Sequence, residues 1–145
     1  MRHYVVVAHR TLGGAHLMEH LRQLRAEDPY CRFHLVVPRR HRSTGPSPEN
    51  EEVVAARAAL DEVLGRMASM GIGATGDVGD PNPVLAAGDA IRREGVDNVT
   101  AVIVSTLPKR SSQWLRGEVP QRIANDWPLI PVTHVAVDVS TATLV

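Results

Sequence analysis

The sequence predicts an α/β domain with a five-stranded parallel sheet and helices on both faces. Short β-branched runs recur along the chain, and longer segments with apolar residues at helical spacing separate them. This alternation is typical of βα units, in which each helix crosses over to a parallel strand. The length of 145 residues, 43% of them apolar, fits one domain with a substantial core. We therefore expect a single three-layer domain over residues 1–145.

Each predicted strand is a short apolar run bounded by turn-forming residues. The sequence YVVVA at 4–8 is the first, FHLVV at 33–37 the second, AVIV at 101–104 the fourth and VTHVAV at 132–137 the last. The candidate for the third strand is ATGDV at 74–78, where an interior glycine weakens the pattern.

The connecting segments carry helix start and stop signals. Asn82 and Pro83 predict the N-cap and first position of a helix that ends near Glu94, before Gly95. After the fourth strand, Pro120 interrupts a helical spacing, so we expect two short helices, the second starting near this proline. The core-facing residues expected in the first two helices are Leu17, Leu21, Leu24, Val53, Leu60, Val63 and Met67.

The segment at about 38–48, PRRHRSTGPSP, holds four cations and three prolines and is expected to be a mobile surface loop. Ser47 and Pro48 predict that the second helix starts at its end, and Gly71 predicts where that helix stops.

Composition excludes several classes of function. The 16 basic and 16 acidic residues cancel, so no overall field favours nucleic acid or an anionic membrane. The apolar runs are too short to span a bilayer and no signal peptide is visible, so we expect a cytoplasmic protein without nucleic-acid or membrane partners. Cys31 is the only cysteine, which excludes an internal disulfide, and we expect it to be buried.

Ligands of open parallel sheets bind beyond the carboxyl ends of the strands, so the segments that follow the strands are candidate binding loops. These are HRTLGG at 9–14, GDPNP at 79–83 and STLPKRSS at 105–112. The last combines four hydroxyl groups, two cations and the start of a helix, a chemistry that can hold phosphate. The alternative is that its hydroxyls cap the helix and its cations are solvated.

Five parts of the sequence resemble the universal stress protein family, within the group of adenine-nucleotide α/β hydrolase-like folds. They are VVVAHRTLGG, FHLVVP, GDVGDPNP, VIVSTLPKRSSQWLRGEVP and IPVTHVAV, and together they cover nearly the whole chain. The resemblance implies the sheet order 3-2-1-4-5. It also implies a ligand site between the first and fourth strands, where nucleotide-binding members hold ATP.

The chain resembles a variant of that family without the Gly-x2-Gly-x9-Gly-Ser/Thr motif. The first two glycine positions fall on Ser105 and Pro108, and His9 stands where the first strand usually ends in aspartate. Two alternatives stay open for the altered loop, a rebuilt anion site or a rigid structural loop. The residues expected to bind nucleotide or phosphate are His9, Thr11, Val37, Gly79, Asp80, Ser105, Thr106, Lys109, Arg110, Ser111 and Ser112. Among them Thr11 and Asp80 would reach the sugar, and Val37 would border the base.

The resulting expectation is a non-catalytic regulatory or stress-response protein that binds an adenine nucleotide, such as ATP, or another phosphorylated small molecule. A ligand-free homodimeric interaction module is the alternative, and a nucleotide-hydrolysing or nucleotidyl-transferring enzyme is a third. His16 and His20 are one helical turn apart, but the sequence offers no third ligand, so no metal is predicted.

The last predicted strand outlasts the others. Val135, Val137 and Val139 alternate in a strand pattern. An overhanging edge strand can pair with a second copy, so we expect a homodimer through these residues; the alternative is a frayed terminus.

Overall fold

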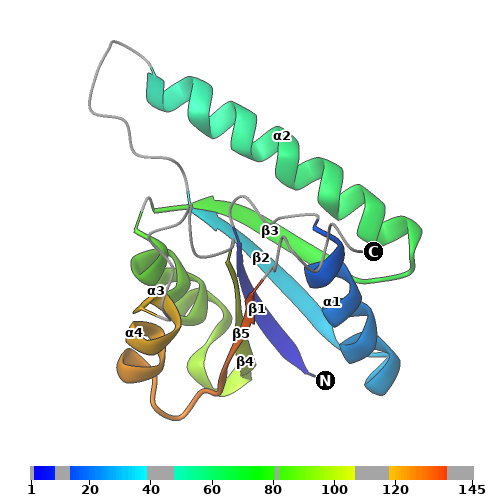
Figure 1. The fold of residues 1–145 in the computed structure, drawn as a ribbon, viewed down its shortest axis with the longest axis vertical. Helices are drawn as coiled ribbons and strands as arrows, with labels where there is room; N and C mark the ends of the chain where they lie inside the picture. Colours follow the sequence, from blue (N-terminus) through cyan, green and yellow to red (C-terminus); the bar gives the residue numbers. More distant parts are fainter. Residues whose placement is uncertain (1, 9–13, 39–47, 81, 107–117, 137–145) are drawn as a thin grey trace.

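The architecture follows the predicted alternation of strands and helices. It was obtained as a computed structural model, which describes residues 2–8, 14–38, 48–80, 82–106 and 118–136 (Figure 1). For residues 48–52, 106, 118 and 136 it describes the backbone only. The elements are β1 (His3–Ala8), α1 (Ala15–Glu27), β2 (Arg32–Pro38), α2 (Pro48–Ser69), β3 (Ala74–Gly79), α3 (Pro83–Glu94), a 3-10 turn η1 (Val96–Asn98), β4 (Val99–Thr106), α4 (Glu118–Asp126) and β5 (Val132–Ala136).

The five strands form one parallel sheet in the order β3-β2-β1-β4-β5. This confirms the predicted fold class and strand order. The glycine-containing candidate at 74–78 is a strand and pairs with β2 along its whole length. Both β3 and β5 are edge strands, and β1 lies in the middle between β2 and β4.

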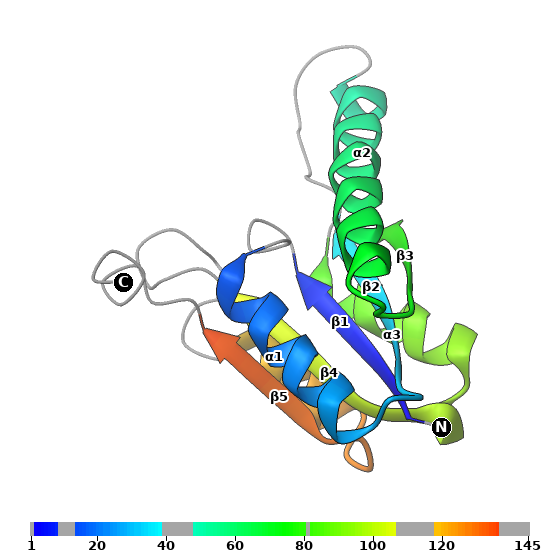
Figure 2. The same ribbon diagram turned by 90° about the vertical axis from the view of Figure 1, so that its right-hand side faces the viewer.

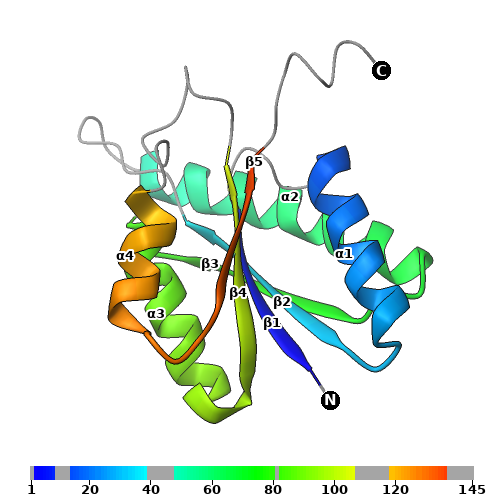
Figure 3. The same ribbon diagram turned by 60° about the horizontal axis from the view of Figure 1, so that its bottom comes forward.

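The helices cover both faces of the sheet and create two separate cores. On one face α1 and α2 pack against the strands, and on the other α3 and α4 do so (Figures 2 and 3). Neighbouring residues of β1 alternate between the two cores, since Tyr4 and Val6 belong to the first and Val5 and Val7 to the second. Strands buried on both faces explain the continuous apolar runs that predicted them.

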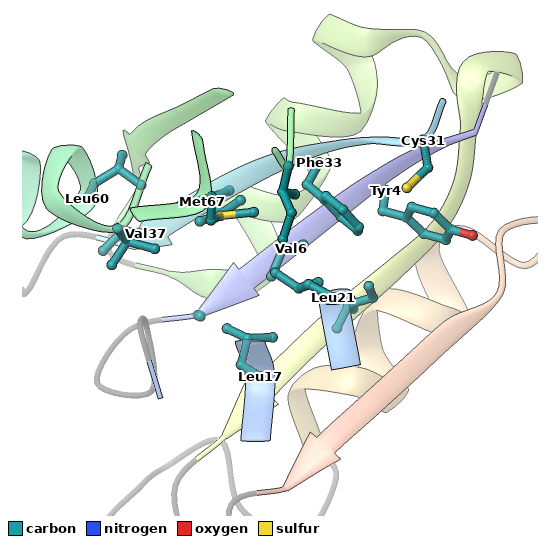
Figure 4. Packing of buried hydrophobic residues seen from close by; sticks show 14 residues of the cluster. Tyr4, Val6, Leu17, Leu21, Cys31, Phe33, Val37, Leu60 and Met67 are labelled. Atoms are coloured by element: carbon teal, nitrogen blue, oxygen red, sulfur yellow. The ribbon is translucent and has the colours of Figure 1, made fainter. Parts of the chain in front are cut away.

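The first core holds the aromatic residues of the sheet. The rings of Tyr4 and Phe33 stack with centroids 5.5 Å apart, and Leu17 and Leu21 of α1 belong to the same cluster (Figure 4). Cys31 lies in this cluster with 3% of its surface exposed, which confirms the expected burial. Of the seven predicted core-facing helix residues, Leu17, Leu21, Leu60, Val63 and Met67 are fully buried, while Leu24 and Val53 are partly exposed.

Helix α3 begins and ends where its sequence signals predict. The Asn82 side chain accepts hydrogen bonds from the backbone N–H groups of Val84 and Leu85, which caps the first turn. At the other end Gly95 adopts a φ of 95°, a conformation that glycine tolerates and other residues rarely adopt. The amide of Gly95 still donates to the carbonyl of Ile91 and closes the last turn.

The end of β4 differs from prediction. Strand β4 runs from Val99 to Thr106, so Ser105 and Thr106 are strand residues. Pro38 is the last residue of β2 and Pro48 the first of α2, and residues 39–47 of the predicted loop lie outside the described residues. Helix α4 begins at Glu118, near Pro120 as predicted; proline is compatible with a first helical turn, whose N–H groups have no intrahelical acceptor.

The described helices include none that is both long and apolar enough to cross a membrane.

Candidate functional site

The carboxyl ends of β1 and β4 lie side by side at one edge of the sheet. Ala8, the last residue of β1, pairs with Ser105, the last residue but one of β4. The chain leaves β1 for α1 on one face, whereas α3, on the other face, leads into β4. Strand order therefore reverses between β1 and β4, which is the position where open α/β sheets bind ligands.

Ser105 occupies this position in an unexpected way. Its residue is only 1% exposed and lies within the strand, whereas the sequence placed it in an open loop. Thr106 follows as the final residue of β4 and pairs with Ala136 of β5. Ser105 therefore forms part of the buried end of β4 and offers little surface to a ligand.

Val37 and Gly79 reach the same edge from β2 and β3. Val37 is 4% exposed and its side chain belongs to the core beneath α2, so little of its surface is available to a ligand base. A methyl group on Gly79 would lie 3.0 Å from Cβ of Ala86 and 3.2 Å from Cγ1 of Val36. This glycine therefore lets α3 approach the sheet closely.

Asp80 begins the turn that leads into α3. Its Oδ1 accepts a hydrogen bond from the backbone N–H of Asn82 at 2.9 Å, and Asn82 in turn caps the helix. In the sheet order, β2 separates the end of β3 from the end of β1. One carboxylate oxygen of Asp80 thus has a structural role, and its position is one strand removed from the switch point.

Helix α1 begins at the same edge, directly after the segment that follows β1. Its N-cap is Gly14, which has no side chain to satisfy the amides of the first turn, and the first turn contains no acidic residue. Such a helix start offers N–H groups and a partial positive charge to an anion. His16 and His20 lie further along α1, and both are partly buried. The described part of the chain holds no group of three or more metal-ligating side chains.

The remaining predicted site residues lie outside the described residues. These are His9, Thr11, Lys109, Arg110, Ser111 and Ser112 for the ligand, and Val137 and Val139 for the dimer interface. Val135 is described, lies in β5 and packs partly buried against the first core.

No protein-family model matches the sequence, and no curated protein matches it. Solved structures do match its fold. A protein from the universal stress protein family of Burkholderia pseudomallei has a TM-score of 0.59 and 18% identity, over 91% of this chain and 94% of that chain. A universal stress protein from Archaeoglobus fulgidus has a TM-score of 0.59 and 14% identity, over 93% and 95% of the two chains. The chain has the universal stress protein fold.

A third match of the same fold carries a ligand. The universal stress protein family protein from Arabidopsis thaliana, solved with AMP bound, has a TM-score of 0.54 and 13% identity, over 95% of this chain and 94% of that chain. Each of the three comparisons covers more than 90% of both chains, so the likeness extends over the whole fold.

Sequence reasoning did not single out the buried histidine of β2. His34 is only 9% exposed, whereas His134 on the edge strand β5 is exposed. The ring of His34 lies 2.7 Å (Nδ1) from the Thr75 hydroxyl and 3.4 Å (Nε2) from a carboxylate oxygen of Asp77. The available signal was a single polar residue within the apolar run FHLVV.

Proposed function

We propose that this protein is a non-catalytic regulatory or stress-response protein that binds an adenine nucleotide or another phosphorylated small molecule. The observation that carries the proposal is the adjacency of the β1 and β4 ends at the point where strand order reverses. The AMP bound to the Arabidopsis thaliana protein of the same fold supports the choice of an adenine nucleotide. The cytoplasm is the proposed location.

In the proposed site, the segment after β4 supplies the groups that hold phosphate. Lys109 and Arg110 provide charge, and the hydroxyls of Ser111 and Ser112 provide donors. The uncapped start of α1 adds backbone N–H groups at the same edge. Charge and hydroxyls then take the place of the glycines that hold ATP in the family this sequence resembles.

Thermal denaturation with ATP, ADP, AMP and inorganic phosphate tests the site. A ligand at about 100 times its dissociation constant stabilises the native state by about 2.7 kcal/mol, which raises Tm by several degrees in a domain of this size. The double variant Lys109→Ala, Arg110→Ala should lose the shift. The matched control, Arg22→Ala, Arg25→Ala on α1, should keep it. If none of the four compounds raises Tm, the protein is better explained as a ligand-free interaction module, and nucleotide turnover abolished by His9→Ala would favour an enzyme.

We also propose a homodimer in which the last strands of two copies pair. The two sheet edges differ in a way that supports it. At β3, Arg57 donates to the backbone carbonyl of Gly76 at 3.1 Å, and both Arg57 and Arg93 face the carboxylate of Asp77. Charged side chains over an edge strand discourage pairing with another chain. At β5 the alternation of apolar residues continues in the sequence through Val137 and Val139.

Sedimentation equilibrium measures this dimer directly. Val139→Lys should give a monomer, because a lysine in the middle of a paired strand would bring like charges of two copies together. The control Val54→Lys, on an exposed position of α2, should leave the dimer intact. If the wild-type protein is still monomeric at about 100 times the concentration used to sediment the variants, the proposal is contradicted.

A further inference from the structure

A polar stripe crosses three neighbouring strands at the amino edge of the sheet, opposite the proposed nucleotide site. The parallel register aligns His3 of β1 with Arg32 of β2, and His34 of β2 with Thr75 of β3. On each strand an adjacent residue belongs to the α1 and α2 core or packs against it, namely Tyr4, Phe33, Leu35 and Ala74, so these four side chains project from the opposite face, which α3 covers. A parallel sheet with helices on both faces is normally apolar at such positions.

This stripe borders a cavity of about 200 Å³ at the end of α3. The last residue of α3, Glu94, lines it from the helix side, and the chain turns away at Gly95. Val5, the register neighbour of His34, provides an apolar wall. Pockets for drug-sized ligands typically measure about 300–1,000 Å³, so this cavity is small. The cavity therefore fits a molecule much smaller than a nucleotide.

The charges around the cavity are arranged as two separated poles. The carboxylate of Glu94 lies 3.8 Å from Nδ1 of His34, at the inner end. Arg32 precedes His34 by two residues, which places its Cα about 6.6 Å further toward the amino edge at 3.3 Å per strand residue. Among the described residues, the guanidinium of Arg32 has no ion pair or hydrogen bond, and Glu94 has no arginine or lysine partner.

The nearly buried imidazole of His34 lines the cavity, with 10% of its side chain exposed. Its Nδ1 faces Thr75 and Glu94, which also line the cavity, whereas its Nε2 faces Asp77, which does not. Burying such a polar ring costs free energy that an apolar residue would avoid. Local departures of this kind from apolar patterning are expected at functional sites.

We propose that this cavity binds a small zwitterion, of which an α-amino acid with a short side chain is the simplest. Arg32 binds its carboxylate, for which the planar guanidinium is well suited. Glu94 binds its ammonium group, and the Thr75 hydroxyl supplies a further hydrogen bond. Val5 faces the short side chain. The site goes beyond the proposed nucleotide binding, because it lies at the other edge of the sheet and uses none of the same residues.

Two-dimensional ¹H–¹⁵N NMR of the full chain tests the proposal with glycine, L-alanine and L-serine as probes. We expect saturable shifts of the amides of His3, Arg32, Thr75 and Glu94. Acetate carries only the carboxylate and methylamine only the ammonium group, so each should bind at least tenfold more weakly. If none of the three zwitterions gives saturable shifts at these amides, the proposal is wrong.

Charge-removing variants show which side chains are responsible. Arg32→Gln and Glu94→Gln should each weaken binding at least tenfold, while the matched controls Arg22→Gln on α1 and Glu62→Gln on α2 should leave it unchanged. Unaltered amide positions in the rest of the spectrum verify that each variant is folded. Equal affinity in Arg32→Gln, Glu94→Gln and the wild type would overturn the assignment. Titration of AMP into the same sample should shift only amides at the carboxyl edge, so failure of the nucleotide proposal and failure of this one are distinguishable.

Discussion

Two glycines illustrate how the surroundings of one residue decide what it contributes. A methyl group on Gly76 in β3 would lie 2.8 Å from Cδ1 of Leu60 and 3.1 Å from the carbonyl oxygen of Leu35. The leucine side chain can move, but the backbone oxygen is fixed by the sheet. Gly65 in α2 has no atom within 4 Å of that position.

We predict opposite effects for alanine at these two positions. Gly76→Ala should destabilise the protein by about 1–3 kcal/mol, because the added methyl overpacks the contact between α2 and β3. Gly65→Ala should stabilise it by about 0.5–1 kcal/mol, since alanine loses less backbone entropy in a helix. Urea denaturation measures both, and a Gly76→Ala protein as stable as the wild type would contradict the close approach.

Among the described residues, Cys31 has an altered ionisation that experiment can follow. Burial, followed by the nearby charge of Asp28, raises the pKa of its thiol. The folded protein thus favours the neutral thiol. Its contribution to stability is fully present below the pKa of the unfolded thiol, about 8.5, and is lost as pH rises through that value to the raised pKa.

We predict slow reaction of Cys31 with a disulfide reagent at pH 8 in the native protein, and fast reaction in denaturing urea. The reactive species is the thiolate, which is both scarce and shielded in the fold. A Cys31→Ala, Ser69→Cys variant carries an exposed thiol at the end of α2 and should react quickly without urea. Equal native rates for the two thiols would show that Cys31 is accessible.

At the scale of elements, the N-terminus of α3 depends on one side chain. The Oδ1 of Asn82 accepts from the N–H of Val84 at 2.9 Å and lies 3.5 Å from that of Leu85. Asn82→Ala should therefore cost about 1 kcal/mol, the usual effect of losing an N-cap. Asn82→Asp keeps an acceptor and adds a charge favourable to the helix dipole, so its stability should equal or exceed the wild type. Thermal denaturation of both variants measures the difference, and an unaltered Tm for Asn82→Ala would refute the capping role.

The same element shows what local signals can predict. Asn82, Pro83 and Gly95 specified α3 from sequence alone, because caps act through neighbouring backbone groups. The predicted end of β4, Val104, was wrong by two residues. Ser105 and Thr106 resemble loop residues in composition, but pairing with β1 and β5 keeps them in the ladder. Such pairing depends on strands distant in sequence and leaves no local signal.

At the scale of the whole molecule, Asp77 on edge strand β3 connects the two helical layers. Its carboxylate faces Arg57 of α2 on one side of the sheet and Arg93 of α3 on the other. All three side chains are substantially exposed, so each pair contributes little to global stability. Their position makes them more important for local opening of the edge.

We predict that Asp77→Asn lowers global stability by no more than about 1 kcal/mol but clearly accelerates amide hydrogen exchange in β3. The control Asp89→Asn removes a pair with Arg92 within α3 and should leave β3 exchange unchanged. The effect of Asp77→Asn should shrink in 1 M salt, which screens exposed charges. Equal β3 exchange in Asp77→Asn and the wild type would mean that the arginines do not secure this edge.

The sequence by itself determined the fold class, the elements and most of the core, because apolar periodicity and capping residues act over short distances. Tertiary structure decided which polar residues share a site. His34 in β2, Thr75 in β3 and Glu94 in α3 are far apart in the chain and meet only through strand register and the crossing of α3 over the sheet. In the same way, Ala8 and Ser105 become neighbours only because β4 pairs with β1. Local patterns encode secondary structure, whereas sites depend on long-range pairing.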